Sequence, residues 1–394
     1  MKLPMKLRLA AFAAAATVAF AAQAANELKI GFLSTLSGPA SALGIEVRDG
    51  FNLALKLAGG KLGGLPTEVV IADDQLNPEV GKQLTERLIK RDRVNLMTGI
   101  IFSNVMLAVW PTIEESKTFY IAPNSTPTRI SGEGCSPYFF SASWPNEGHH
   151  EAAGHFAQSK GYKNAYLIAP NYPAGKDALT GFKRSYKGNI VNEMYTKVNQ
   201  LDYSAELAQI RAAKPDTLYA FLPGGMGINF IKQFVASGLS KDIQLVLPGF
   251  SADQDVIRAV GEPMLGLFDT SQWAYDLDND ANRKFVAEFE KTYNRLPTLY
   301  AEQGYTTALI IDQAVKAAKG RVEDMKTFRA SLMRAPTQVK TPRGDWEAAH
   351  NGTPVQDYYV RVVSKDDKGR IVNKKIGTVM NAHTDFWAKD CKLK

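Results

Sequence analysis

The sequence has few of the side chains on which most enzymes and metal proteins depend. Its 394 residues include only five histidines and two cysteines. There is no P-loop and no G-x-S-x-G elbow, and the glycines that follow Gly224 do not complete the G-x-G-x-x-G pattern of a dinucleotide site. No acid–base constellation is evident. We therefore expect a protein that is not an enzyme and has no cofactor, and we keep a secreted enzyme or a sensor's ligand-binding partner as the minority alternative.

The few histidines are also wrongly spaced for a metal site. Zinc proteases place two histidines four residues apart on one helical face, with a glutamate beside the first. His150 and His155 are five residues apart, and His149 and His155 are six apart. We therefore expect no metal, and interpret His149 and His150 as a surface pair at the start of a helix.

Charge blocks, low-complexity tracts and basic stripes are absent as well. The net charge is +7, and three of these charges lie in the first 24 residues, which leaves +4 for the rest of the chain. Such weak and dispersed charge does not predict binding to nucleic acid. Because 45% of the residues are hydrophobic, the chain is globular, and it is too long for one ordinary core. Two lobes are expected.

One long apolar run is present, at the start of the chain. Basic residues precede a mostly apolar run over 9–22, which ends in the small-x-small triplet Ala22-Gln23-Ala24. The run is shorter than the roughly 20 residues that span a bilayer as a helix. We predict a signal peptide over 1–24, cleaved after Ala24; a buried Ala-rich helix is the alternative. No later run is long enough to cross a membrane, so direct membrane insertion is not expected.

The two cysteines, Cys135 and Cys391, are far apart in the sequence. In an oxidising compartment a pair of cysteines suggests one disulfide, here between the C-terminal tail and the first third of the chain. Two free thiols remain the alternative.

Short apolar strands alternate with amphipathic helices in two series. The strands of the first series are expected at 28–33, 68–72, 94–101 and 118–122. Those of the second are expected at 164–169, 189–195, 216–222 and 243–247, with helices at 175–187, 204–213 and 226–237. Later segments follow at 280–294 and 298–319 (helices) and at 357–363 and 371–380 (strands). This alternation predicts an α/β fold with two doubly wound parallel-sheet lobes, between which the chain crosses more than once.

Ligands of open parallel sheets bind beyond the carboxyl ends of the strands. Ser103-Asn104 follows the third strand as a helix N-cap signal, and Asn124-Ser125-Thr126 follows the fourth strand and also begins a helical stretch. Hydroxyls and free N–H groups at two adjacent helix starts could hold one carboxylate without a basic residue. Ordinary capping is the alternative for each segment.

The strand ends of the second lobe are aromatic or rich in glycine. They include Tyr172, Gly224, Phe250 and Trp273. An aromatic wall opposite an anion site would suit a small apolar or aromatic acid. Packing in the core is the alternative for each aromatic residue.

Taken together, these stretches resemble the leucine/isoleucine/valine-binding proteins of bacterial ABC importers, which have the type I periplasmic-binding fold. The similarity covers essentially the whole mature chain. It is carried by Ile30–Pro39 with Gly44, Asp73-Asp74-Gln75 with Asn77-Pro78, Gly99 with Ser103, Ile121–Thr126, and Tyr300–Ala308.

The resemblance implies two lobes joined by a three-crossover hinge. The first would comprise 26–143 plus 274–336, and the second 144–273 plus 337–394. It also implies a monomer in the periplasm that captures a solute and docks on an ABC permease, whose separate ATPase subunits use ATP.

The resemblance further implies roles for first-lobe residues. Ser103 resembles the family serine that holds the ligand carboxylate, and Thr126 resembles its threonine partner. Asn124 and Ser125 match the positions beside that threonine.

Other positions would form the rest of the pocket. Tyr172 resembles the second-lobe aromatic residue that closes over the ligand, while Leu43 and Phe102 match side-chain-pocket positions. Trp273 is aligned more loosely, as a pocket wall near a crossover.

One departure from the family pattern concerns the ligand. Amino-acid binders of this family place a glutamate after the second-lobe Pro-Gly turn, where it pairs with the ligand's ammonium; here Phe250 follows Pro248-Gly249. A buried ammonium without a counter-charge costs several kcal/mol. We therefore expect an organic acid without an α-amine, most simply an aromatic carboxylate. A branched-chain amino acid or amide is the alternative, with Asp253 or Asp255 as the counter-charge.

Overall fold

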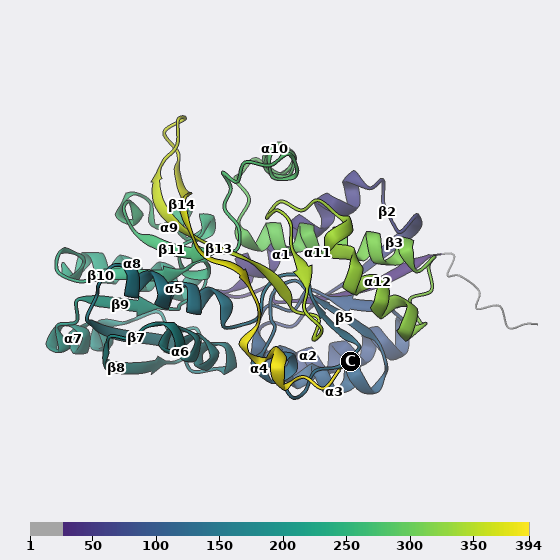
Figure 1. Cartoon of the computed structure of the whole chain (residues 1–394), viewed down its shortest axis with the longest axis horizontal. Helices are drawn as coiled ribbons and strands as arrows, with labels where there is room; N and C mark the ends of the chain where they lie inside the picture. The colour runs from purple at the N-terminus through teal and green to yellow at the C-terminus, as the bar shows by residue number, and fades with distance from the viewer. Residues whose placement is uncertain (1–26, 394) are drawn as a thin grey trace, which may run out of the picture.

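The structure is a computed structural model that describes residues 27–393 and has two lobes, each built on one mainly parallel sheet (Figure 1). The predicted α/β class with two doubly wound lobes is confirmed. The predicted signal peptide over 1–24, with its cleavage site, lies outside the described residues.

The first lobe is built on a six-stranded sheet with the order β2-β3-β1-β4-β5-β6. Its pairings are parallel except for that of β2 with β3. The strands are β1 (Leu28–Ser34), β2 (Lys61–Leu62), β3 (Leu65–Asp73), β4 (Leu96–Thr98), β5 (Phe119–Ala122) and β6 (Phe139–Ser141). The helices from this part of the chain are α1 (Ser41–Leu57), α2 (Pro78–Glu86) with the π-helical turn Arg87–Arg91, α3 (Ser103–Glu115) and α4 (Thr128–Ser131). Three later helices complete this lobe: α10 (Asp280–Tyr293), α11 (Leu299–Ala317) and α12 (Met325–Gln338).

Two glycines let α1 and α11 cross closely. A Cβ atom at Gly50 would lie 1.8 Å from the carbonyl oxygen of Ala301, and one at Gly304 would lie 1.9 Å from that of Val47. Any larger residue at either position would push the helices apart. The first lobe is thus assembled from two distant parts of the chain.

The second lobe is built on an eight-stranded sheet with the order β12-β13-β11-β10-β9-β7-β8, in which β14 also pairs with β13. Five strands are parallel: β7 (Asn164–Pro170), β8 (Asn189–Thr196), β9 (Thr217–Ala220), β10 (Gln244–Pro248) and β11 (Phe268–Ser271). Three are antiparallel additions: β12 (Glu347–Ala348), β13 (Pro354–Lys365) and β14 (Ile371–His383). The helices are α5 (Gly148–Ser159), α6 (Pro173–Ser185), α7 (Ser204–Ala213), α8 (Gly225–Ala236) and α9 (Gln254–Val260). Short 3-10 turns lie at Leu239–Lys241, Gly249–Ser251 and Glu262–Met264.

Three crossovers, 142–147, 272–279 and 339–346, join the lobes, as the fold prediction requires, and the chain passes between the lobes a fourth time after β14. After β14 it returns to the first lobe, where the 3-10 turn Phe386–Asp390 packs on α4 (Figure 1).

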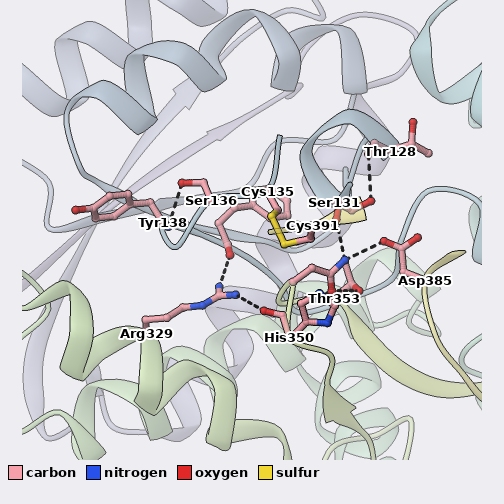
Figure 2. Close-up of a disulfide and its surroundings, with 12 residues drawn as sticks. Thr128, Ser131, Cys135, Ser136, Tyr138, Arg329, His350, Thr353, Asp385 and Cys391 are labelled. Atoms are coloured by element: carbon pink, nitrogen blue, oxygen red, sulfur yellow. Dashed lines mark hydrogen bonds between the residues drawn. A yellow bond between two sulfur atoms is a disulfide. The ribbon is translucent and has the colours of Figure 1, made fainter. Parts of the chain in front are cut away.

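A disulfide between Cys135 and Cys391 fixes this C-terminal segment to the first lobe (Figure 2). Around it, the Asn351 side-chain amide donates hydrogen bonds to the Ser131 carbonyl at 2.8 Å and to the Asp385 carboxylate at 3.1 Å. The predicted disulfide is therefore present, and the end of the chain is held both covalently and by hydrogen bonds.

Most predicted elements are found within a few residues of their expected bounds, and Asn77 caps α2 through N–H groups of Glu79 and Val80. Two predicted helix starts are wrong. Phe102, not Ser103, is the N-cap of α3, and 124–126 begin no helix, because the short α4 starts only at Thr128. The sequence pattern predicts neither β11 nor α12.

Candidate ligand-binding site

A cavity lies between the lobes, with about 380 Å³ of empty space that includes a part open to solvent. It forms where the carboxyl ends of parallel strands from both sheets face each other, as expected for this architecture. The first lobe contributes Leu43, Ile101, Phe102, Asn124, Ser125 and Tyr300 to its lining. The first crossover and the second lobe contribute Trp144, Asn146, His150, Tyr172, Ala174, Phe221, Pro223 and Phe250.

Aromatic rings form most of the wall. The Tyr172 ring stacks on Phe221, with centroids 6.3 Å apart and planes 19° from parallel, and it also contacts Phe102 across the lobe boundary at 6.0 Å. Phe250 packs against Trp144 at 4.7 Å and Tyr300 at 6.1 Å. These rings give the cavity an aromatic, apolar wall that suits another ring.

The first-lobe end of the cavity carries hydrogen-bond donors. Phe102, the N-cap residue of α3, lines the cavity, so the first turn of this helix and its free N–H groups lie beside it. The Ser125 hydroxyl is buried, and no residue within 27–393 gives it a hydrogen-bond partner. An unpaired buried donor is costly unless a ligand satisfies it. The combination of helix start and hydroxyl is that of an anion site.

No aspartate, glutamate, lysine or arginine lines the cavity within the described part of the chain. Burial raises the pKa of Tyr172 and of Tyr300 and lowers that of His150 well below its ordinary value. All three side chains are therefore uncharged at neutral pH.

The two carboxylates that could pair with an ammonium do not line the cavity. Asp253 is paired with Arg361 at 3.3 Å and accepts a hydrogen bond from the N–H of Leu299. Asp255 is buried in α9, and its pKa is raised to about 7 by burial and by the nearby Asp253 and Glu46.

Six of the ten predicted ligand-binding residues line the cavity: Leu43, Phe102, Asn124, Ser125, Tyr172 and Phe250. Gly224 lies just behind the lining, where a Cβ atom would be 3.5 Å from the Leu43 side chain.

The other three predicted residues lie outside the lining. The Ser103 hydroxyl accepts a hydrogen bond from the N–H of Ala174 at 2.8 Å, and Thr126 shares a 2.8 Å hydrogen bond with Ser141. Trp273 packs away from the cavity, with its Nε1 donating to Asn282 at 2.8 Å.

Sequence reasoning missed eight lining residues: Ile101, Trp144, Asn146, His150, Ala174, Phe221, Pro223 and Tyr300.

The interpretation of His149 and His150 as a surface pair is wrong, since the exposed fractions of their side chains are 0% and 1%. Helix α5 begins at the lobe boundary and is covered there by strands β10, β11 and β13, so its first turn is buried. Among the missed residues, Trp144 and Asn146 lie in a crossover between the lobes, and this position was the signal from which their place in the cavity lining could have been predicted.

The family model described as periplasmic binding protein matches residues 27–369. The chain belongs to this family. Among curated periplasmic binding proteins it is 29% identical to the Leu/Ile/Val-binding protein homolog 6 of Brucella melitensis, over 94% of this chain and 95% of that protein.

Solved structures of the family give a closer comparison. An ABC transporter solute-binding protein from R. palustris, solved in complex with benzoate, is 32% identical, with a TM-score of 0.87 over 93% of this chain and 100% of that one. One from Rhodopseudomonas palustris BisB5, in complex with 3,4-dihydroxybenzoic acid, is 28% identical, with a TM-score of 0.84 over 92% and 99% of the two chains. The predicted family is confirmed.

Two searches of residues 27–393 complete the description. No helix there has both the length and the apolar composition needed to cross a bilayer. No group of three or more histidine, cysteine, aspartate or glutamate side chains there is arranged to hold a metal ion.

Proposed function

We propose that this protein captures a small aromatic carboxylate between its lobes and delivers it to an ABC permease with separate ATPase subunits. The observation that carries the proposal is a cavity with aromatic walls, an unpaired buried hydroxyl at its first-lobe end and no charged side chain in its lining. Benzoate and 3,4-dihydroxybenzoic acid, the ligands of the two Rhodopseudomonas proteins, combine an aromatic ring with a carboxylate, the chemistry that such a lining would accept.

The first lobe would bind the carboxylate through the first turn of α3 and the hydroxyl of Ser125. Ser103, which is outside the lining in this structure, would join them through its remaining proton. Asn124 and the backbone around Thr126 would hold Ser125 in place. The second lobe would then rotate about the crossovers and cover the ring with Tyr172 and Phe250. Since all lining groups are uncharged, the carboxylate would be held by dipoles and hydroxyls alone.

We further propose that the mature protein acts in the periplasm as a monomer and releases its ligand chemically unchanged. The lining offers no charged acid or base at neutral pH. Mass spectrometry of the acid after prolonged incubation with the protein tests this part, because a new product would indicate an enzyme.

A branched-chain amino acid is the second candidate, favoured by the name of the Brucella relative. It requires Asp255, or another carboxylate, to reach the ligand's ammonium. In this structure Asp255 does not line the cavity, which places the amino acid second.

Thermal-shift measurements on residues 25–394 distinguish the two candidates. Benzoate and 3,4-dihydroxybenzoate should raise the melting midpoint, because a ligand at 100 times its Kd stabilises the folded state by about 2.7 kcal/mol. Benzyl alcohol, which keeps the ring but lacks the carboxylate, is the control and should have little effect. A larger shift with leucine than with benzoate would reverse the ranking.

A further inference from the structure

His150 lines the cavity from the second lobe, whereas the helix start of α3 belongs to the first lobe. It is the third residue of α5, and the exposed fraction of its side chain is 1%. Its ring packs edge-on against Phe221, with centroids 4.9 Å apart, and lies 6.0 Å from Phe250. It is thus a polar side chain set into the aromatic wall, where a ligand ring would lie.

The hydrogen bonding of His150 fixes which ring nitrogen carries the proton. Its Nδ1 is hydrogen-bonded to the hydroxyl of Tyr219. Tyr219 is fully buried, and no other residue within 27–393 is hydrogen-bonded to that hydroxyl. If Nδ1 carried the proton, the tyrosine's own proton would have no acceptor in a site without water-accessible surface. The favoured arrangement has Tyr219 donating to Nδ1, which leaves the proton of the neutral imidazole on Nε2.

The Nε2 atom of His150 has no hydrogen-bond partner in the part of the chain that the structure describes. The neighbouring His149 differs in its position. Its Nδ1 is bonded to the Thr270 carbonyl at 3.0 Å and its Nε2 is also unpaired within residues 27–393, but its ring packs against Phe250 and does not line the cavity. An N–H group in the lining of a cavity is left for whatever fills that cavity.

We propose that the Nε2–H group of His150 donates a hydrogen bond to an oxygen substituent on the ligand's ring, at the end away from the carboxylate. This inference rests on the proposed function and narrows its ligand class to aromatic acids with a hydroxyl, alkoxy or carbonyl oxygen on the ring. A plain benzoate would leave the donor unpaired, so the site discriminates in favour of the oxygenated ring. Because the Nε2–H group is a donor, it cannot accept a hydrogen bond from an ammonium group at this position.

The test is the ratio of the benzoate Kd to the Kd of the best of 2-, 3- and 4-hydroxybenzoate, measured by calorimetry. In the wild-type protein the ratio should be about ten, the factor expected from one neutral hydrogen bond. In the double variant His150→Phe/Tyr219→Phe, which removes both partners and leaves no orphaned hydroxyl, the ratio should fall to about one. His155→Phe, on the exposed face of the same helix, is the matched control and should keep the wild-type ratio.

The tautomer has a separate readout. Nitrogen-15 NMR of the histidine-labelled protein should show His150 protonated at Nε2, and its N–H proton should shift when the hydroxybenzoate is added. Protonation at Nδ1, or a ratio unchanged in the double variant, would overturn the inference while leaving the proposed function intact. Failure of every aromatic acid to bind the wild-type protein would instead overturn both.

Discussion

The hydroxyl of Ser103 accepts a hydrogen bond from the backbone N–H of Ala174 at 2.8 Å, across the boundary between the lobes. A hydroxyl has one proton and two lone pairs, so this contact leaves the proton of Ser103 free to donate. A ligand carboxylate beside the start of α3 would accept it. The Ser103 hydroxyl would then bind the ligand's carboxylate and the second lobe at the same time, so ligand binding and lobe closure would be coupled.

Ser103→Ala should therefore weaken the binding of benzoate by about 1.5–3 kcal/mol, the scale of a hydrogen bond to a charged group. Calorimetric titration measures the loss, and Ser103→Thr, which keeps a hydroxyl, should recover most of it. A melting curve confirms that both variants fold. Equal affinity in wild type and Ser103→Ala would exclude the hydroxyl from the carboxylate site.

Phe250→Glu should lower the affinity for benzoate by more than tenfold and relatively favour leucine. The new carboxylate would lie against Trp144 and Tyr300, where it repels an acid and can pair with an ammonium. Phe250→Gln has the same shape without the charge and separates electrostatics from lost ring packing. Titrations of both variants with benzoate and with leucine measure these affinities. A similar loss of benzoate affinity in Phe250→Glu and Phe250→Gln would argue against the charge effect.

Asp177→Ala should weaken the binding of every ligand by a similar factor, about tenfold. Asp177, on α6, accepts hydrogen bonds from the Thr128 hydroxyl at 3.1 Å and from Asn146 at 2.8 Å, so it joins the second lobe to the first. Its removal shifts the closing equilibrium, and it also frees the side chain of Asn146, which lines the cavity. Small-angle scattering with saturating benzoate should then show a more open average shape. Asp242→Ala, an exposed change on the same lobe, serves as the control; selective loss for one ligand only would contradict the interpretation.

Asp255 should make the protein less stable as the pH rises through about 7. Burial raises its pKa to about 7 from an ordinary value near 3.8, so the folded state binds a proton that the unfolded state releases. The stability from this group is present in full below pH 3.8 and is lost as the pH approaches and passes 7. Asp255→Asn removes the penalty and should raise the unfolding free energy at pH 8 by an amount on the order of 2–4 kcal/mol. Melting curves of both proteins at pH 5 and pH 8 provide the comparison, and an equal difference at the two pH values would exclude the titration of Asp255.

The sequence was sufficient for the layout of the fold because strand and helix periodicity is local. It also placed Phe250 and Tyr172 at the cavity, since residues at the carboxyl ends of parallel strands converge. Its capping prediction for Ser103 was wrong, because that hydroxyl is engaged by a backbone N–H 71 residues away instead of capping its own helix. It failed for His150 because burial of the first turn of α5 depends on strands that follow much later in the chain. Contacts of this kind are set by how the lobes meet, and no local pattern encodes them.

The disulfide between Cys135 and Cys391 bears on how the molecule is made. Its second cysteine lies three residues from the end of the sequence, and the two are separated by 256 positions. Helices α10 to α12, which cover the first lobe, are also synthesised after the parallel strands of the second. The first lobe is therefore completed late: its final helices follow the parallel strands of the second lobe, and its disulfide can form only once Cys391 has been synthesised.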